Sequence, residues 1–115
     1  MRYVLSDRQR RRNGGTDYLE FTRGDYDTGT GTPWKKDSVY VSAYDWRGIE
    51  GLGTFLGKYM DFDLYGISRC DSAGWDEIKK ACRSADWEIL RLVAELDSAV
   101  SDWLHEDGCF SVIGL

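Results

Sequence analysis

The chain has 115 residues, with 15 lysines and arginines against 20 aspartates and glutamates and a formal net charge of −5. A hydrophobic share of 42% and an aromatic share of 14% argue against a disordered chain and indicate one packed domain over residues 1–115. Cys70, Cys82 and Cys109 form no CxxC pair or Cys/His cluster, so neither a disulfide framework nor a metal or cofactor site is expected.

The charge is unevenly distributed along the chain. Residues 1–15 hold five arginines and one aspartate, a charge of +4, whereas residues 16–115 hold ten basic and 19 acidic residues, a charge of −9. An acidic body attracts basic proteins and repels nucleic acid, although negative charge also simply keeps a protein soluble. The charged N-terminal residues and the lack of a run of about 18 apolar residues predict no signal peptide and no membrane span. A cytoplasmic protein is therefore expected.

The first third of the chain predicts two strands joined by a polar turn. Arg2–Leu5 has the composition of a short strand, and Ser6–Gly15 is an arginine-rich turn that ends in Asn-Gly-Gly. The arginines of this turn could bind phosphate or an acidic protein, but a solvated hairpin tip is the favoured interpretation. Asp17–Arg23 alternates between polar and apolar residues, which predicts a half-buried strand with Leu19 and Phe21 facing the core.

The segment Gly24–Asp37 is a long loop, and loops of this length in compact domains are often functional. Tyr26 and Trp34 make it a candidate contact loop. Asp25 and Asp27 are too few oxygen ligands for a calcium loop, because glycines occupy the later ligand positions.

The middle of the chain predicts two more strands and a short helix. Ser38–Trp46 alternates with Val39, Val41 and Ala43 on one face, and its other face is a row of aromatic residues expected in the core. Apolar residues at helical spacing predict a short helix within 48–60, and its glycines do not match a phosphate-binding loop. Asp61–Arg69 predicts a further strand with a kink at Gly66.

The strongest pattern lies between residues 72 and 108. Apolar residues recur every three or four positions and predict one amphipathic helix from about Trp75 to Glu106, with at most a minor kink near Ser84. The residues of this stripe are Trp75, Ile78, Cys82, Ala85, Ile89, Val93, Leu96, Val100 and Trp103. A final strand is expected over 109–115. The fold class is therefore α+β: a mostly antiparallel, twisted sheet packed against one long C-terminal helix plus one short helix.

A second stripe on the same helix is acidic. Glu88, Glu95, Asp102 and Glu106 fall roughly opposite the apolar residues, at spacings that drift by only about 20° per heptad. An ordinary solvated helix face is the simpler explanation. Together with Tyr26 and Trp34, these residues are the candidate partner-binding residues, because the acidic body and the surplus of aromatic residues favour a docking surface.

Catalytic signals are weak. His105 lies near the end of the long helix, and nothing in the sequence brings it beside Cys109 as a catalytic dyad. Asp61 and Asp63 could form a carboxylate pair, but paired-carboxylate hydrolysis needs a defined separation across a cleft. No catalytic residue is assigned, and the protein is expected not to be an enzyme.

These features favour a small acidic binding protein that inhibits a basic, nucleic-acid-handling partner such as a nuclease. Its carboxylates would pair with the lysines and arginines that normally bind phosphate. In size and charge the chain is similar to small anti-CRISPR, anti-restriction and toxin-immunity proteins, so neutralisation of a bacterial toxin is an alternative. A carboxylate-dependent enzyme and a nucleic-acid-binding module that uses the N-terminal arginines are further alternatives. Direct binding of nucleic acid or membrane is not expected, and the oligomeric state is left open.

Overall fold

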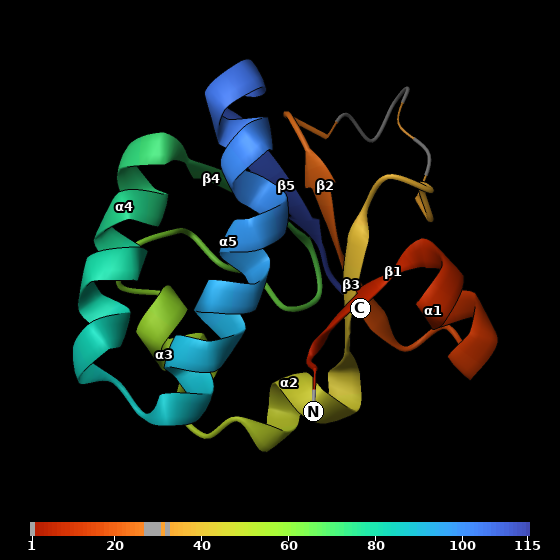
Figure 1. Ribbon diagram of the computed structural model, residues 1–115, viewed down its shortest axis with the longest axis horizontal. Coiled ribbons are helices and arrows are strands. Elements are labelled where there is room, and N and C mark those ends of the chain that lie inside the picture. The colour runs from red at the N-terminus through yellow and green to blue at the C-terminus, as the bar shows by residue number, and fades with distance from the viewer. Residues whose placement is uncertain (1, 27–30, 32) are drawn as a thin grey trace.

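The computed structural model describes residues 2–26, 31 and 33–115. Over these residues strands and helices are interspersed along the chain (Figure 1). The strands are β1 (Val4–Ser6), β2 (Tyr18–Arg23), β3 (Val39–Ser42), β4 (Ile67–Asp71) and β5 (Cys109–Ile113). The α-helices are α1 (Asp7–Asn13), α2 (Ala43–Gly48), α3 (Leu52–Leu56), α4 (Ser72–Ala81) and α5 (Trp87–Asp107).

The strands form one antiparallel sheet in the order β1-β3-β2-β5-β4. β2 lies at its centre, where Leu19 pairs with Val41 of β3 and Phe21 pairs with Val112 of β5. The sheet and the long C-terminal helix confirm the predicted α+β class, in which a mostly antiparallel sheet packs against helices.

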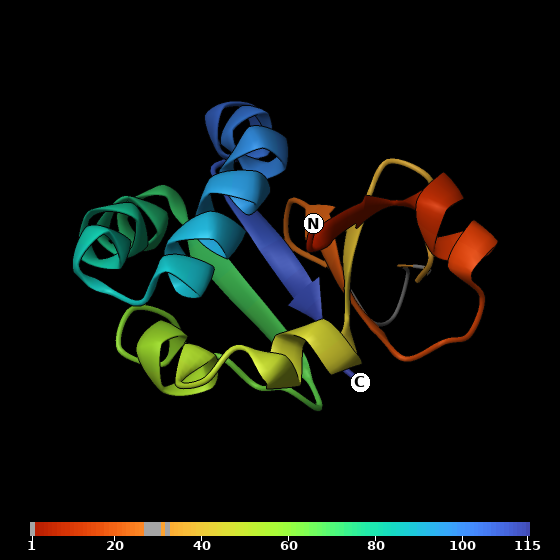
Figure 2. The same ribbon diagram turned by 60° about the horizontal axis from the view of Figure 1, so that its bottom comes forward.

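One side of the sheet and the helices on it form the hydrophobic core. α5 crosses this side over β5 and β2, and α4 lies beside α5 (Figures 1 and 2). Ile89, Val93 and Leu96 of α5 are buried in the core cluster, as the apolar stripe predicted. The sheet contributes Leu19, Phe21, Val41, Phe110 and Val112 to the same cluster.

The other side of the sheet is covered as well. Its buried side chains include those of Glu20, Thr22, Tyr40 and Ser111. The loop after β2 lies over them, and the backbone N–H of Tyr26 donates to Ser111 Oγ at 2.9 Å. α1 stands apart from the other helices, next to β1 and β3 (Figure 2). The strand predicted at 17–23 is therefore confirmed as β2, but its predicted half-burial is wrong, because residues 18–22 are buried on both faces.

The predicted arginine-rich turn at 6–15 is instead helix α1. Ser6 caps this helix: its Oγ accepts from the Gln9 N–H at 3.2 Å, and Gln9 Oε1 accepts from the Ser6 N–H at 2.9 Å. This reciprocal pair is a capping box, which satisfies two backbone donors at the helix start. The arginines therefore lie on a regular helix rather than on a hairpin tip.

Two of the predicted strands are shorter than expected. The strand at 38–46 ends at Ser42, whose Oγ accepts from the Asp45 N–H at 3.1 Å and starts α2. The predicted row of aromatics is therefore split, with Tyr40 and Trp46 buried and Tyr44 exposed. The strand expected at 61–69 begins only at Ile67, and residues 61–66 form a loop that precedes it.

The single long helix predicted from 75 to 106 is two helices. α4 ends in a 3₁₀ turn at Cys82–Ser84, and Ala85 and Asp86 adopt extended backbone angles before α5 begins. Trp75 Nε1 of α4 donates to Asp97 Oδ1 of α5 at 2.8 Å, which joins the two helices side by side.

No helix in the described part of the chain is long and apolar enough to cross a bilayer.

Candidate functional site

The predicted acidic stripe does not form one continuous surface, because Glu95 faces inward. Its Oε1 accepts from the backbone N–H groups of Tyr3 at 2.9 Å and Val4 at 3.1 Å, and its Oε2 accepts from Arg91 Nε at 3.2 Å. The side chain is only 15% exposed. Glu95 therefore fastens the start of β1 to α5 and is not available to a partner.

The other three acidic residues of the stripe differ in their contacts. Glu88 Oε2 accepts from the Tyr3 hydroxyl at 3.1 Å, so it too contacts the N-terminal segment. Glu106 pairs with Arg23, which also bonds Asp107 at 2.8 Å. Asp102 is exposed. The four residues thus lie in four different environments, and the structure does not bring them together as one site.

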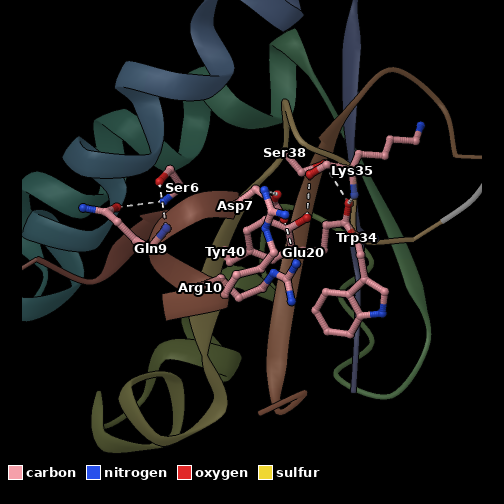
Figure 3. Close-up of polar contacts among 10 residues, drawn as sticks. Ser6, Asp7, Gln9, Arg10, Glu20, Trp34, Lys35, Ser38 and Tyr40 are labelled. Atoms are coloured by element: carbon pink, nitrogen blue, oxygen red, sulfur yellow. Dashed lines mark hydrogen bonds and ion pairs between the residues drawn. The ribbon is translucent and has the colours of Figure 1, made fainter. Parts of the chain in front are cut away.

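Of the aromatic residues of the long loop, Tyr26 bonds within the loop and Trp34 packs against the sheet. The Tyr26 hydroxyl donates to the Gly31 carbonyl at 3.3 Å. Trp34 stacks on Tyr40 with ring centroids 5.9 Å apart, and the Arg10 guanidinium lies 4.5 Å from the Trp34 ring (Figure 3). Trp34 is still 37% exposed, so only part of its ring is accessible to a partner.

A buried carboxylate holds this loop in place. Glu20 is 2% exposed and accepts three hydrogen bonds, from the Trp34 N–H at 2.6 Å, the Lys35 N–H at 3.0 Å and Ser38 Oγ at 2.7 Å (Figure 3). A buried charge is tolerated when its oxygens are satisfied in this way. Glu20 therefore has a structural role, because its hydrogen bonds hold the backbone at Trp34 and Lys35.

The groups considered for catalysis are not brought together. Cys70, Cys82 and Cys109 are free and buried, and burial raises the pKa of the Cys70 thiol to about 12. His105 is exposed, whereas Cys109 is buried. Asp63 Oδ1 accepts from the Tyr65 N–H at 3.0 Å within its loop. Among the residues that the structure places, no group of three or more histidines, cysteines or carboxylates could hold a metal ion.

A different set of carboxylates surrounds a pocket of about 520 Å³, which we call the acidic pocket. Its lining residues are Tyr3, Asp17, Tyr44, Asp45, Arg47, Gly48 and Glu88. They come from four places in the chain: the N-terminal segment, the approach to β2, helix α2 and the first turn of α5. The lining has three carboxylates and one guanidinium, so its formal charge is negative.

Hydrogen bonds fix the walls of the acidic pocket to one another. The Ala43 N–H donates to the Asp17 carbonyl at 2.9 Å, which joins the approach to β2 with the start of α2. Tyr3 donates to Glu88, which joins the N-terminal segment with α5. The Ser42 cap sets the first turn of α2, where Asp45 lies. The pocket is therefore formed by anchored backbone rather than by loop ends.

The electrostatics of Tyr3 reflect this negative environment. Burial is the main cause that raises the pKa of Tyr3, followed by its hydrogen bond to Glu88 and the negative charges of Glu88 and Asp45, while Arg91 opposes them. Raising a phenol pKa means that further negative charge is unfavourable there. The negative charges of Glu88 and Asp45, which contribute to this shift, would attract a cation placed in the same pocket.

Tyr44 gives the acidic pocket an aromatic wall. Its side chain is 86% exposed, the highest among the exposed large hydrophobic residues of the described chain. The face of a tyrosine ring attracts a guanidinium or ammonium group, and carboxylates beside it supply hydrogen-bond acceptors. The arrangement can therefore bind the side chain of an arginine or lysine.

The sequence contains a signal for part of this site. Ser42-Ala-Tyr-Asp45 follows the pattern of a helix N-cap with an acidic residue three positions later, and it would have placed Tyr44 and Asp45 on a helix. The approach of Asp17 and Glu88 depends on tertiary contacts and has no local signal.

Comparison of the chain with protein-family models, with curated proteins and with solved structures finds no match.

Proposed function

We propose that this chain is an acidic binding protein that docks a basic segment of a protein partner in the acidic pocket. The observation that carries the proposal is the position of Asp17, Asp45 and Glu88 around one pocket beside the exposed ring of Tyr44. Paired arginine–carboxylate contacts are short and directional, so such a pocket selects basic side chains.

Two large apolar side chains near the start of α5 are exposed. Trp87, immediately before Glu88, is 64% exposed, and Leu90 is 41% exposed. Tryptophan and tyrosine are enriched among the residues that contribute most to protein interfaces. Trp87, next to Glu88 in the chain, is therefore a further candidate contact residue.

Inhibition of a nucleic-acid-handling protein is the function that fits this chemistry best. Lysines and arginines that bind phosphate form basic surfaces, and a carboxylate that occupies one of them blocks the phosphate. The charge of −9 over residues 16–115 would speed the encounter with such a surface at low salt. A nuclease toxin neutralised by an immunity protein would present the same basic surface.

Three carboxylates at one pocket are also what the alternative of a carboxylate-dependent enzyme requires. Tyr44, at 86% exposure, leaves the pocket open to solvent. Acid–base catalysis by two carboxylates needs a fixed separation across a cleft and benefits from the exclusion of water. An open pocket with an exposed aromatic ring favours docking over catalysis.

A pair of charge-reversed variants tests the proposal. Asp17→Lys/Asp45→Lys reverses the acidic pocket, and Asp61→Lys/Asp102→Lys makes the same change in net charge at two exposed carboxylates elsewhere. The wild-type chain is used in a pull-down from a cell lysate, and the partner that it retains is identified by mass spectrometry. The purified partner is then titrated with the wild type and each variant. Its binding to nucleic acid is measured in the same titrations.

We expect the Asp17→Lys/Asp45→Lys variant to bind this partner at least about tenfold more weakly and to lose inhibition, because like charges would face each other. The Asp61→Lys/Asp102→Lys variant should bind nearly as well as the wild type. Binding should weaken as salt rises. A partner that is itself acidic, or equal binding by the wild type and the pocket variant, would contradict the proposal.

A further inference from the structure

A second pocket of about 520 Å³ has the opposite charge, and we call it the basic pocket. It lies between the β1 segment, α1 and α5, and it shares no lining residue with the acidic pocket. Its polar and charged lining residues are Arg2, Ser6, Arg8, Gln9, Arg12, Glu95 and Ser98. Val4, Leu5, Val39 and Ala99 supply its apolar lining.

The four arginines of α1 divide into two pairs. Arg10 and Arg11 pair with the buried carboxylate of Asp7 at 2.7 and 3.0 Å, and the hydrogen bond from Arg10 holds the pKa of Asp7 below its usual value. Arg8 and Arg12 make no ion pair with any residue that the structure describes. They are four positions apart on α1, so they lie on the same face of that helix.

The remaining charges of the basic pocket leave it positive. Arg2 Nε lies 3.9 Å from Glu95 Oε1, and the Arg2 side chain is 68% exposed. Glu95 already accepts from the Tyr3 and Val4 N–H groups and from Arg91. The lining therefore has three guanidinium groups and one carboxylate, and that carboxylate is engaged in holding β1.

The backbone around the basic pocket is well anchored. The capping box between Ser6 and Gln9 fixes the first turn of α1 (Figure 3), and the Gly14 N–H donates to the Arg10 carbonyl at its other end. Glu95 fixes β1 on α5. Arg8 and Arg12 are therefore presented from a held helix, which lowers the cost of placing them around a ligand.

We propose that the basic pocket binds a small phosphate ester. The arginines would bind the phosphate group, and the apolar group of the ester would contact Val4, Leu5 and Val39. Guanidinium groups bind phosphate oxygens through paired hydrogen bonds, and several of them together favour a doubly charged anion. No residue of the described chain that lines this pocket is aromatic. Stacking on aromatic rings is the usual way to bind single-stranded nucleic acid, so a small ester fits the pocket better than a nucleic acid strand.

The test is a calorimetric titration of the full chain with hexyl phosphate, inorganic phosphate and a single-stranded oligothymidylate. Arg8→Gln/Arg12→Gln removes two charges from the basic pocket, and Arg69→Gln/Arg83→Gln removes two exposed arginines that line neither pocket. All four positions are exposed. Thermal unfolding of each variant checks that the fold is retained.

Hexyl phosphate should bind the wild type more tightly than inorganic phosphate, because only the ester also contacts the apolar lining. Arg8→Gln/Arg12→Gln should weaken this binding by about tenfold or more, and Arg69→Gln/Arg83→Gln should leave it within about twofold. No heat with hexyl phosphate, or equal binding by the wild type and Arg8→Gln/Arg12→Gln, overturns the proposal. Arginine-dependent binding of the oligothymidylate without binding of hexyl phosphate overturns it as well, in favour of a nucleic acid site.

Discussion

Replacing Glu95 with alanine is expected to lower the free energy of unfolding by about 3 kcal/mol, because two backbone donors of β1 would lose a charged acceptor. The donors are the N–H groups of Tyr3 and Val4, and both residues are buried. Glu95→Gln keeps one oxygen acceptor and should cost about 1 kcal/mol. Urea denaturation followed by circular dichroism measures both.

Asp102→Ala is the matched control for Glu95→Ala, since Asp102 lies seven residues later on the same helix and is exposed. Its unfolding free energy should change by no more than about 0.5 kcal/mol. If Glu95→Ala and Asp102→Ala were equally harmless, Glu95 would not anchor β1, and the acidic stripe would regain its simplest interpretation as a solvated face.

Replacing Glu20 with alanine is expected to lower the free energy of unfolding by about 4 kcal/mol, more than Glu95→Ala. Glu20 is buried at 2% exposure, and its loss leaves the Trp34 and Lys35 N–H groups and the Ser38 hydroxyl without their acceptor. The segment that contains Lys35 and Lys36 should then separate from the sheet. Urea denaturation measures the stability, and the rate of tryptic cleavage after these lysines measures the release of the loop.

Glu20→Gln keeps one acceptor oxygen and should lie between the wild type and Glu20→Ala in both measurements. Glu50→Ala, at an exposed position, is the control and should change neither by much. Unchanged stability together with unchanged cleavage in Glu20→Ala would mean that the loop does not depend on this buried carboxylate.

The core was predictable from the sequence because apolar periodicity reports burial directly. Ile89, Val93 and Leu96 are buried as their spacing indicated. The break between α4 and α5 was missed for a physical reason: both helices pack on the same side of the sheet, so the apolar stripe continues across the break. The Trp75–Asp97 hydrogen bond between the helices shows the change of direction that periodicity cannot report.

The candidate binding surface was harder to predict, because it depends on contacts between distant segments. Glu95 and Tyr3 are 92 residues apart in the chain, and only the folded structure brings them together. An acidic residue that is outward by helical periodicity can therefore face another element. By contrast, the Ser6-x-x-Gln9 pattern that starts α1 is local, and a search for caps would have found it.

The most direct test of the central claim, that basic partners bind at the acidic pocket and not at Asp102 and Glu106 farther along α5, is a nuclear magnetic resonance titration with an arginine-rich peptide. We expect the largest amide shifts in the ¹⁵N-labelled chain at Asp17, Tyr44, Asp45 and Glu88. Largest shifts at Asp102 and Glu106, with the pocket residues unmoved, would contradict it.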